Sequence, residues 1–194
     1  MEYSFHVHNK LASDGATMAI NKLLALKNSK TKGAGMRPSP FSPPVIVCVG
    51  SDLAIGDSLG PIVGSMIKYK TQGARCFLYG TLTAPVTAKE IRYMRSFLRE
   101  THKGSPVVAI DAAVGEKGDI GLIKLTDTPL LPGAGANKRL GEVGDISILG
   151  IVAEKSVGNY GLLNTTRLNL VYSMSEIISD AVSNFLWNLS AREA

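Results

Sequence analysis

Residues 45–61 carry the sequence VIVCVGSDLAIGDSLGP, in which five apolar residues lead into a loop of mostly small residues that holds Asp57. A second short apolar run, VVAIDAA over residues 107–113, leads into Asp111 in a similar uncharged setting. Apolar runs of this length are typical of strands buried on both faces of a parallel sheet. Open α/β sheets bind ligands at the carboxyl ends of such strands, so we expect both aspartates to line one crevice. Two carboxyls in one crevice can share a proton, which is the minimum that acid/base hydrolysis requires.

From residue 45 onward, segments with the pattern of strands alternate with segments with the pattern of helices. The last predicted helix is the longest, and its apolar residues recur at helical spacing. Alternation of this kind predicts a layered α/β domain with a mostly parallel sheet. The predicted strands cover residues 45–49, 75–79, 106–110, 119–125 (the candidate for an antiparallel strand) and 146–153, and the predicted helices cover 58–70, 85–102 and 164–190.

The first 44 residues differ in character from the rest of the chain. Residues 16–26 have the spacing of a short amphipathic helix. Residues 29–44 contain four prolines among glycine, serine and lysine, which is typical of a linker or an extended strap. We therefore divide the chain into an N-terminal arm and Pro-rich strap, residues 1–44, and a single α/β domain, residues 45–194. Whether the arm packs against the domain or crosses the crevice is left open.

The composition narrows the class of protein. The chain has 194 residues, of which 45% are hydrophobic and 19% charged, as in globular proteins. No apolar stretch approaches the roughly 20 residues that span a bilayer, and the N-terminus lacks a signal-peptide core, so we expect a cytoplasmic protein without a membrane partner. The net charge of +5 is dispersed and accompanies no nucleic-acid motif, so we expect no direct nucleic-acid partner. Cys48 and Cys76 are predicted to be reduced core residues.

Each candidate site residue also has a structural interpretation. Asp57 precedes the predicted helix over 58–70, where aspartate is a favourable N-cap. Asp111 could instead be a buried turn residue whose carboxylate accepts backbone N–H groups. Nucleotide binding is not expected, because the glycines at 50, 56 and 60 do not follow either phosphate-binding spacing.

Two further segments supply candidate binding residues. Residues 131–141 form a glycine-rich loop in which Lys138 and Arg139 could hold an anionic group or a peptide carbonyl. The alternative is a surface loop whose basic side chains are solvated. Thr81 follows the predicted strand over 75–79, so its hydroxyl could point into the same crevice, or it could belong to a simple strand-ending turn.

Three segments in order, GDSLGP at 56–61, AIDA at 109–112 and PGAGANKR at 132–139, resemble the germination protease of spore-forming bacteria. The resemblance is closer still to the short sporulation proteins of the YyaC type. It implies a fold shared with the hydrogenase maturation endopeptidases, a three-layer α/β/α sandwich of the phosphorylase/hydrolase-like kind. Those endopeptidases bind the nickel of their substrate with acidic residues at the positions of Asp57 and Asp111, and with an added histidine. This chain has no histidine between His102 and its C-terminus.

The resemblance implies a sporulation-associated endopeptidase that acts on a protein or peptide substrate, with small acid-soluble spore proteins as the candidates, in the forespore or spore core. Asp57 and Asp111 match the two aspartates proposed as catalytic in the germination protease. Asn137, Lys138 and Arg139, with Thr81, would steady the substrate or the developing oxyanion. We expect no cofactor and no metal site. A non-catalytic sporulation factor that binds a peptide in the same crevice is the alternative, and homo-oligomerisation is left open.

Overall fold

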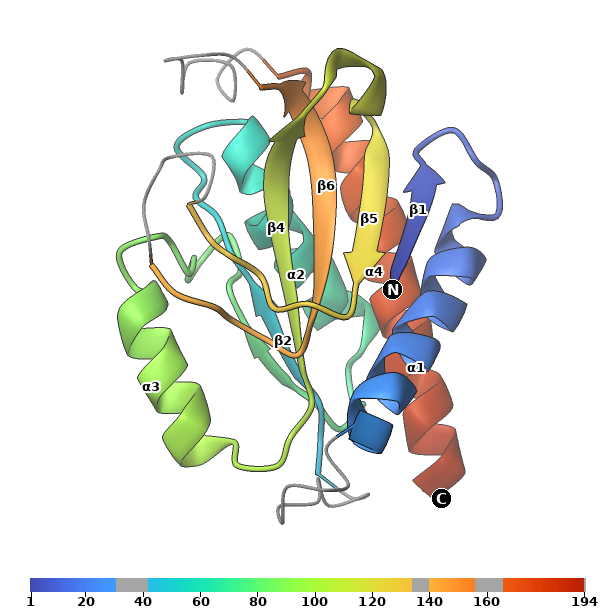
Figure 1. The fold of residues 1–194 in the computed structure, drawn as a ribbon, viewed down its shortest axis with the longest axis vertical. Helices are drawn as coiled ribbons and strands as arrows, with labels where there is room; N and C mark the ends of the chain where they lie inside the picture. The colour runs from blue at the N-terminus through green and yellow to red at the C-terminus, as the bar shows by residue number, and fades with distance from the viewer. Residues whose placement is uncertain (31–41, 134–139, 156–165, 194) are drawn as a thin grey trace.

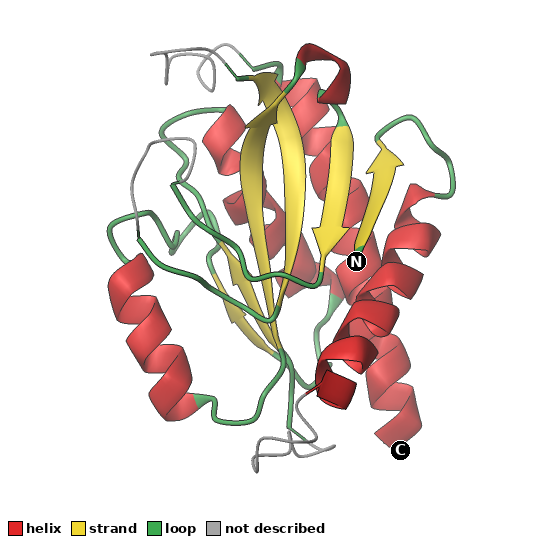
Figure 2. Ribbon diagram, viewed as in Figure 1, coloured by secondary structure: helices red, strands yellow, loops and turns green. Residues whose placement is uncertain are grey.

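A computed structural model describes residues 1–30, 42–133, 140–155 and 166–193. In these residues a six-stranded sheet is covered by helices on both faces (Figures 1 and 2). The elements in chain order are β1 (Glu2–His6), α1 (Ala12–Lys30), β2 (Val45–Cys48), η2 (Gly56–Ser58), α2 (Leu59–Lys70), β3 (Phe77–Tyr79), α3 (Ile91–Thr101), β4 (Val107–Gly115), η3 (Lys117–Asp119), β5 (Leu122–Thr126), β6 (Ile146–Glu154) and α4 (Leu168–Glu193).

The sheet has the strand order β1-β5-β6-β4-β2-β3. Strands β3, β2, β4 and β6 are parallel to their neighbours in this series, whereas β5 runs antiparallel to β6 and to β1. In Figure 1 the arrows of β4 and β6 point to the top of the view, and that of β5 points the opposite way. The antiparallel strand predicted over 119–125 is therefore confirmed as β5, shifted by a few residues.

Two apolar cores lie on opposite faces of the sheet. On one face, α1, α2 and α4 pack against side chains such as Ile46, Val108 and Ile110. On the other face, α3 packs against Val45, Val47 and Ala109, which alternate with the first set along the strands. Every residue of β2 is buried, as expected of a central parallel strand. The three-layer α/β/α sandwich is confirmed.

The N-terminal residues are more closely integrated than the predicted arm. Strand β1 pairs with β5 along its whole length, from Glu2 opposite Thr126 to His6 opposite Leu122. Helix α1 starts four residues before the prediction and buries Ile20 and Leu23 completely in the core shared with α4. Residues 1–30 are thus a packing element at the sheet edge farthest from β2. Residues 31–41 of the predicted strap lie outside the described part of the chain.

Other boundaries differ where tertiary contacts override local pattern. Strand β4 continues to Gly115 instead of ending at 110, because β6 pairs with it as far as Glu154. Helix α3 begins at Ile91 and not near 85, since Val86 forms a bridge with Val49 beside the end of β2. Within the described residues, no helix is long and apolar enough to cross a bilayer.

Helix α2 is held unusually close to β2 and to the end of β3 by glycines. A methyl group on Gly60 would lie 2.0 Å from the Val49 carbonyl oxygen, and one on Gly64 would lie 1.9 Å from the Gly80 carbonyl oxygen. Gly80 itself has a φ of 88° and approaches the Cys48 carbonyl equally closely. Because the atoms in contact are backbone atoms, they cannot turn away as a side chain would. The glycines therefore fix the position of the amino end of α2.

We predict that Gly64→Ala lowers the free energy of unfolding by about 1–3 kcal/mol, as overpacking does in well-packed cores. The direction of the change is informative, because alanine in an unobstructed helix is about 1 kcal/mol more favourable than glycine. Without the close contact, the substitution would therefore raise the free energy of unfolding. Urea unfolding followed by circular dichroism measures the change. Gly118→Ala is the matched control, since a methyl group there meets no atom within 4 Å. An equal effect of both substitutions would contradict the proposed close contact.

Candidate active site

The chain adds its next strands on opposite sides of β2. The chain leaves β2 through α2 and enters β3 on one side, then crosses through α3 to β4 on the other side. A crevice forms at such a switch point, outside the carboxyl ends of the two strands. The backbone N–H of Val49 donates to the Ile110 carbonyl over 2.7 Å, so the two chains are still joined just before Gly50 and Asp111. This edge of the sheet is the candidate active site.

Asp57 is placed by a loop that folds back onto the end of β2. Gly50 has a φ of 143°, and a methyl group there would lie 2.1 Å from the Asp57 carbonyl oxygen. The Ser51 backbone N–H donates to that same carbonyl oxygen over 3.1 Å. These contacts seat η2 directly above β2 and leave the Asp57 side chain half-buried. The N-cap residue of α2 is Ser58, without a side-chain capping bond, so the interpretation of Asp57 as the helix cap is wrong.

Asp111 lies inside β4, not beyond its end. Alternation along the strand places its side chain on the same face as Ala109, toward the α3 side of the sheet. It is opposite Leu149 of β6 and is 9% exposed. One carboxylate oxygen accepts the backbone N–H of Ala112 over 2.8 Å. The local hydrogen bond predicted by the structural interpretation is therefore present, but it satisfies only part of a buried carboxylate.

The two carboxyl groups interact electrostatically. Burial raises the pKa of Asp111 well above its usual range, and the negative charge of Asp57 raises this pKa further. Burial also raises the pKa of Asp57. The Ser51 backbone N–H lowers this pKa, but by less than burial raises it. Of the two, Asp111 is the more deeply buried. Burial and the neighbouring negative charge therefore favour the protonated form of Asp111 more strongly than burial favours that of Asp57.

The remaining predicted site residues are only partly described. Thr81 belongs to a tight turn in which Thr81 and Ala84 exchange two backbone hydrogen bonds of 3.1 Å, and its hydroxyl lies 3.1 Å from that of Thr83. The strand-ending turn is therefore present. Asn137, Lys138 and Arg139 lie outside the described residues.

Sequence analysis overlooked the residues that hold this edge of the sheet together. Gly60 and Gly64 are four residues apart, on one face of the predicted helix, and that spacing was a usable signal for a close contact. Arg95 of α3 donates from Nε to the Glu142 carbonyl over 2.8 Å, and its guanidinium lies against Gly141. No local sequence pattern predicts this contact, because it joins two segments that are 47 residues apart.

The histidines take no part in the candidate site. The His102 side chain lies among Phe77, Tyr79 and Phe97, with its Nε2 atom 2.7 Å from the Tyr79 hydroxyl. Burial lowers the pKa of His102, which favours the neutral ring over the cation. Within the described ranges, no group of three or more His, Cys, Asp and Glu side chains could hold a metal ion.

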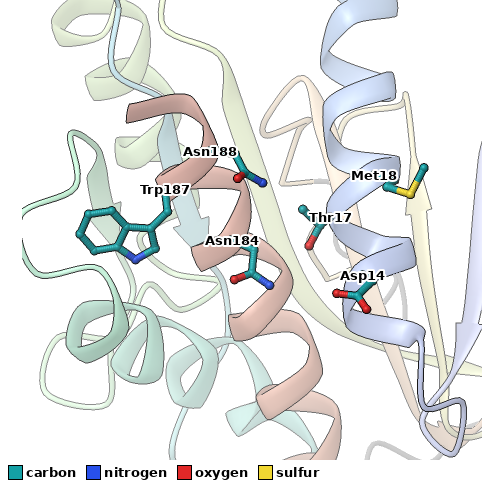
Figure 3. A pocket seen from close by; sticks show the side chains of 6 residues that line it. All are labelled: Asp14, Thr17, Met18, Asn184, Trp187 and Asn188. Atoms are coloured by element: carbon teal, nitrogen blue, oxygen red, sulfur yellow. The ribbon is translucent and has the colours of Figure 1, made fainter. Parts of the chain in front are cut away.

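A shallow pocket of about 290 Å³ lies elsewhere, between α1 and α4 (Figure 3). Figure 3 shows Asp14 and Thr17 facing Asn184 and Asn188 across it, with Trp187 turned away. The Trp187 indole N–H donates to the Lys70 carbonyl over 3.1 Å. None of the pocket residues comes from the carboxyl ends of β2 and β4, so this pocket is separate from the candidate active site.

The architecture is that of an α/β protein with a peptidase among its structural neighbours. The structure of the [NiFe] hydrogenase maturation protease HycI from Thermococcus kodakarensis KOD1 superposes with a TM-score of 0.50. The superposition covers 76% of this chain and 94% of HycI at 18% sequence identity. At this identity the likeness establishes the fold alone.

The chain belongs to the family described as "Protein of unknown function (DUF1256)", whose model matches residues 17–181 and so includes Asp57 and Asp111. It is 40% identical over 150 residues to the protein YyaC of Bacillus subtilis (strain 168), which is described as uncharacterized. This alignment covers 77% of the chain and 73% of YyaC. The resemblance to YyaC-type proteins is thereby confirmed.

The raised pKa of Asp111 makes the stability of the fold dependent on pH. Above about pH 4, the unfolded chain has lost the proton of this carboxyl, whereas the folded chain still holds it. Stability from this group is complete below the unfolded pKa and is lost as the pH rises through the native pKa. We predict that the free energy of unfolding falls between about pH 4 and neutral pH, and that Asp111→Asn reduces this fall.

Urea unfolding at several pH values between about 4 and 8 measures the effect. Asparagine keeps the oxygen that accepts the Ala112 N–H but does not ionise. Asp52→Asn, in an exposed part of the β2–α2 loop, is the control and is expected to keep the parent slope. Parallel curves for the parent protein and Asp111→Asn would show that Asp111 is not preferentially protonated in the folded state.

Proposed function

We propose that this protein is an endopeptidase that hydrolyses a peptide bond of a spore protein with Asp57 and Asp111. The observation that carries the proposal is the convergence of two partly desolvated, electrostatically coupled carboxyls at the switch point of the sheet. Perturbed carboxyls in a crevice are typical of acid/base catalysts. The fold shared with a hydrogenase maturation protease is consistent with such a role.

In the proposed mechanism the two aspartates have different protonation states. Asp57 is the more exposed of the pair and carries the negative charge, so it accepts a proton from a water molecule as the water oxygen attacks the peptide carbonyl. Asp111 carries the proton and hydrogen-bonds to the carbonyl oxygen as negative charge develops there. Collapse of the tetrahedral intermediate breaks the C–N bond, and the leaving nitrogen takes a proton from the carboxyl pair. The products are a free carboxylate and a free amine.

Thr81, Asn137, Lys138 and Arg139 are proposed to bind the substrate. The side chains of Asn137, Lys138 and Arg139 supply hydrogen-bond donors that suit a peptide carbonyl or the developing oxyanion. Arg95 anchors the same β5–β6 connection at Gly141 and Glu142, close after these residues in the chain. We propose Arg95 as a positioning residue for this loop.

A second function is favoured by one observation. The Asp111 carboxylate is already bonded to the Ala112 N–H inside a strand, as in many structural aspartates. If this is its role, the chain is a non-catalytic sporulation factor that binds a protein or peptide in the same crevice. Fold alone does not decide between an enzyme and a binding protein.

We predict that purified protein cleaves small acid-soluble spore protein, and that Asp57→Asn and Asp111→Asn each lower the rate by about 100-fold or more. The double substitution is expected to cost little more than either single one, because the two groups act as a unit. Cleavage is followed by electrophoresis and by mass spectrometry of the new termini. Asp52→Asn is the control for a nearby change in charge.

Two results would reject parts of this proposal. Cleavage at an unchanged rate by both asparagine variants would exclude the aspartate mechanism. Saturable binding of the spore protein without cleavage by any form would favour the non-catalytic alternative.

A further inference from the structure

Three large apolar side chains are exposed in the two loops that border the candidate active site. Leu53 and Ile55, in the β2–α2 loop, are 90% and 38% exposed. Leu82, in the β3–α3 loop, is 43% exposed. We call these three residues the apolar rim. A single exposed leucine is unremarkable in a folded protein, but loops beside a functional site more often carry such residues for binding.

A backbone hydrogen bond joins the two loops that carry the apolar rim. The Gly50 N–H, at the start of the first loop, donates to the Val86 carbonyl in the second over 3.0 Å. Gly50 also contacts both Asp57 and Pro61. Gly50 thus contacts both the loop that carries Leu82 and the residue Asp57. The apolar rim therefore lies next to the candidate site.

Leu82 is held at the tip of its turn by a dedicated contact. Its backbone N–H donates to the Ser65 hydroxyl over 2.9 Å, and that hydroxyl donates to the Pro61 carbonyl over 2.9 Å. The turn is closed by the reciprocal bonds between Thr81 and Ala84. An exposed leucine whose backbone is fixed in this way loses little conformational freedom when a ligand covers it.

The depth of the carboxyl pair limits what can reach it. Asp111 is 9% exposed and lies within a strand, so a peptide bond on a flat protein surface could not approach it. A single extended chain is narrow enough to bring one peptide bond to a carboxyl that a folded surface cannot reach.

We propose that the substrate binds as an extended, locally unfolded polypeptide segment, and that the apolar rim receives one of its large apolar side chains. This inference rests on the proposed function, because it identifies the crevice of Asp57 and Asp111 as the place where the segment lies. Apolar surface beside a polar site supplies binding energy, and the carboxyls supply the chemistry. Leu53 and Leu82 are thereby assigned as specificity-determining residues.

The test separates binding from cleavage by using the Asp57→Asn/Asp111→Asn double variant. The probe is fluorescently labelled α-lactalbumin in two forms: native, and reduced and carboxymethylated, which keeps the sequence but removes the fold. Fluorescence anisotropy is expected to show saturable binding of the unfolded form and none of the native form. Leu53→Ser and Leu82→Ser, each added to the double variant, are expected to weaken this binding about fivefold or more.

Leu11→Ser is the matched control, because Leu11 is 68% exposed but lies between β1 and α1, at the opposite edge of the sheet. It is expected to bind the probe like the parent. Equal binding by all three serine variants, equal binding of native and unfolded probe, or no binding of either would overturn the inference. So would sedimentation showing a dimer that Leu53→Ser dissociates, since a second copy would then cover the rim.

The outcomes distinguish this inference from the proposed function. Rim-dependent binding of the unfolded probe, together with no proteolysis by the parent protein, would reject the endopeptidase and keep the binding site. Aspartate-dependent cleavage of the spore protein that Leu53→Ser and Leu82→Ser leave unchanged would keep the endopeptidase and reject the rim.

Discussion

The close approach of α2 to the carboxyl end of β2 is the constraint on which the candidate site depends. A helix that covers a sheet normally stands off from it by the length of the side chains between them. Here Gly60 and Gly64 remove those side chains where the helix meets the Val49 and Gly80 carbonyls. The amino end of α2 therefore lies close to the sheet, and so does η2, which immediately precedes it. Asp57 reaches the edge of the sheet for this reason.

Burial of Asp111 lowers the free energy of unfolding, and the packing of the rest of the fold must offset this loss. A carboxylate inside a central strand loses most of its hydration, and one hydrogen bond from Ala112 replaces only part of it. Protonation relieves this cost, but a neutral carboxyl in a strand still packs less well than valine would. The apolar cores on both faces of β4 make such a residue tolerable. A buried carboxyl with a perturbed pKa at a switch point is a feature that functional sites often carry.

Sequence predicted the central part of the fold well because its signals are local. The apolar runs at 45–49 and 146–153 are buried on both faces, and the long apolar spacing of α4 has no competing interpretation. The N-terminal strand was missed because β1 is an edge strand with polar residues on its outer positions, and the residues of β5 that pair with it lie 116 to 124 positions further along the chain. The full length of β4 was missed for a similar reason, since pairing with β6 extends it beyond its apolar run.

The β2–α2 loop combines the chemical and the binding parts of the candidate site. Its base is fixed by the contacts of Gly50 with Asp57 and Val86, its far end carries the Asp57 carboxyl, and its middle presents Leu53 to solvent. Exposure therefore increases from Asp111 through Asp57 to Leu53, from the interior of the sheet to the surface. Asp111, the carboxyl whose pKa is raised well above its usual range, lies at the innermost point of this gradient. Because solvation of a charged group falls along the same gradient, burial favours the neutral form of Asp111 more strongly than that of Asp57.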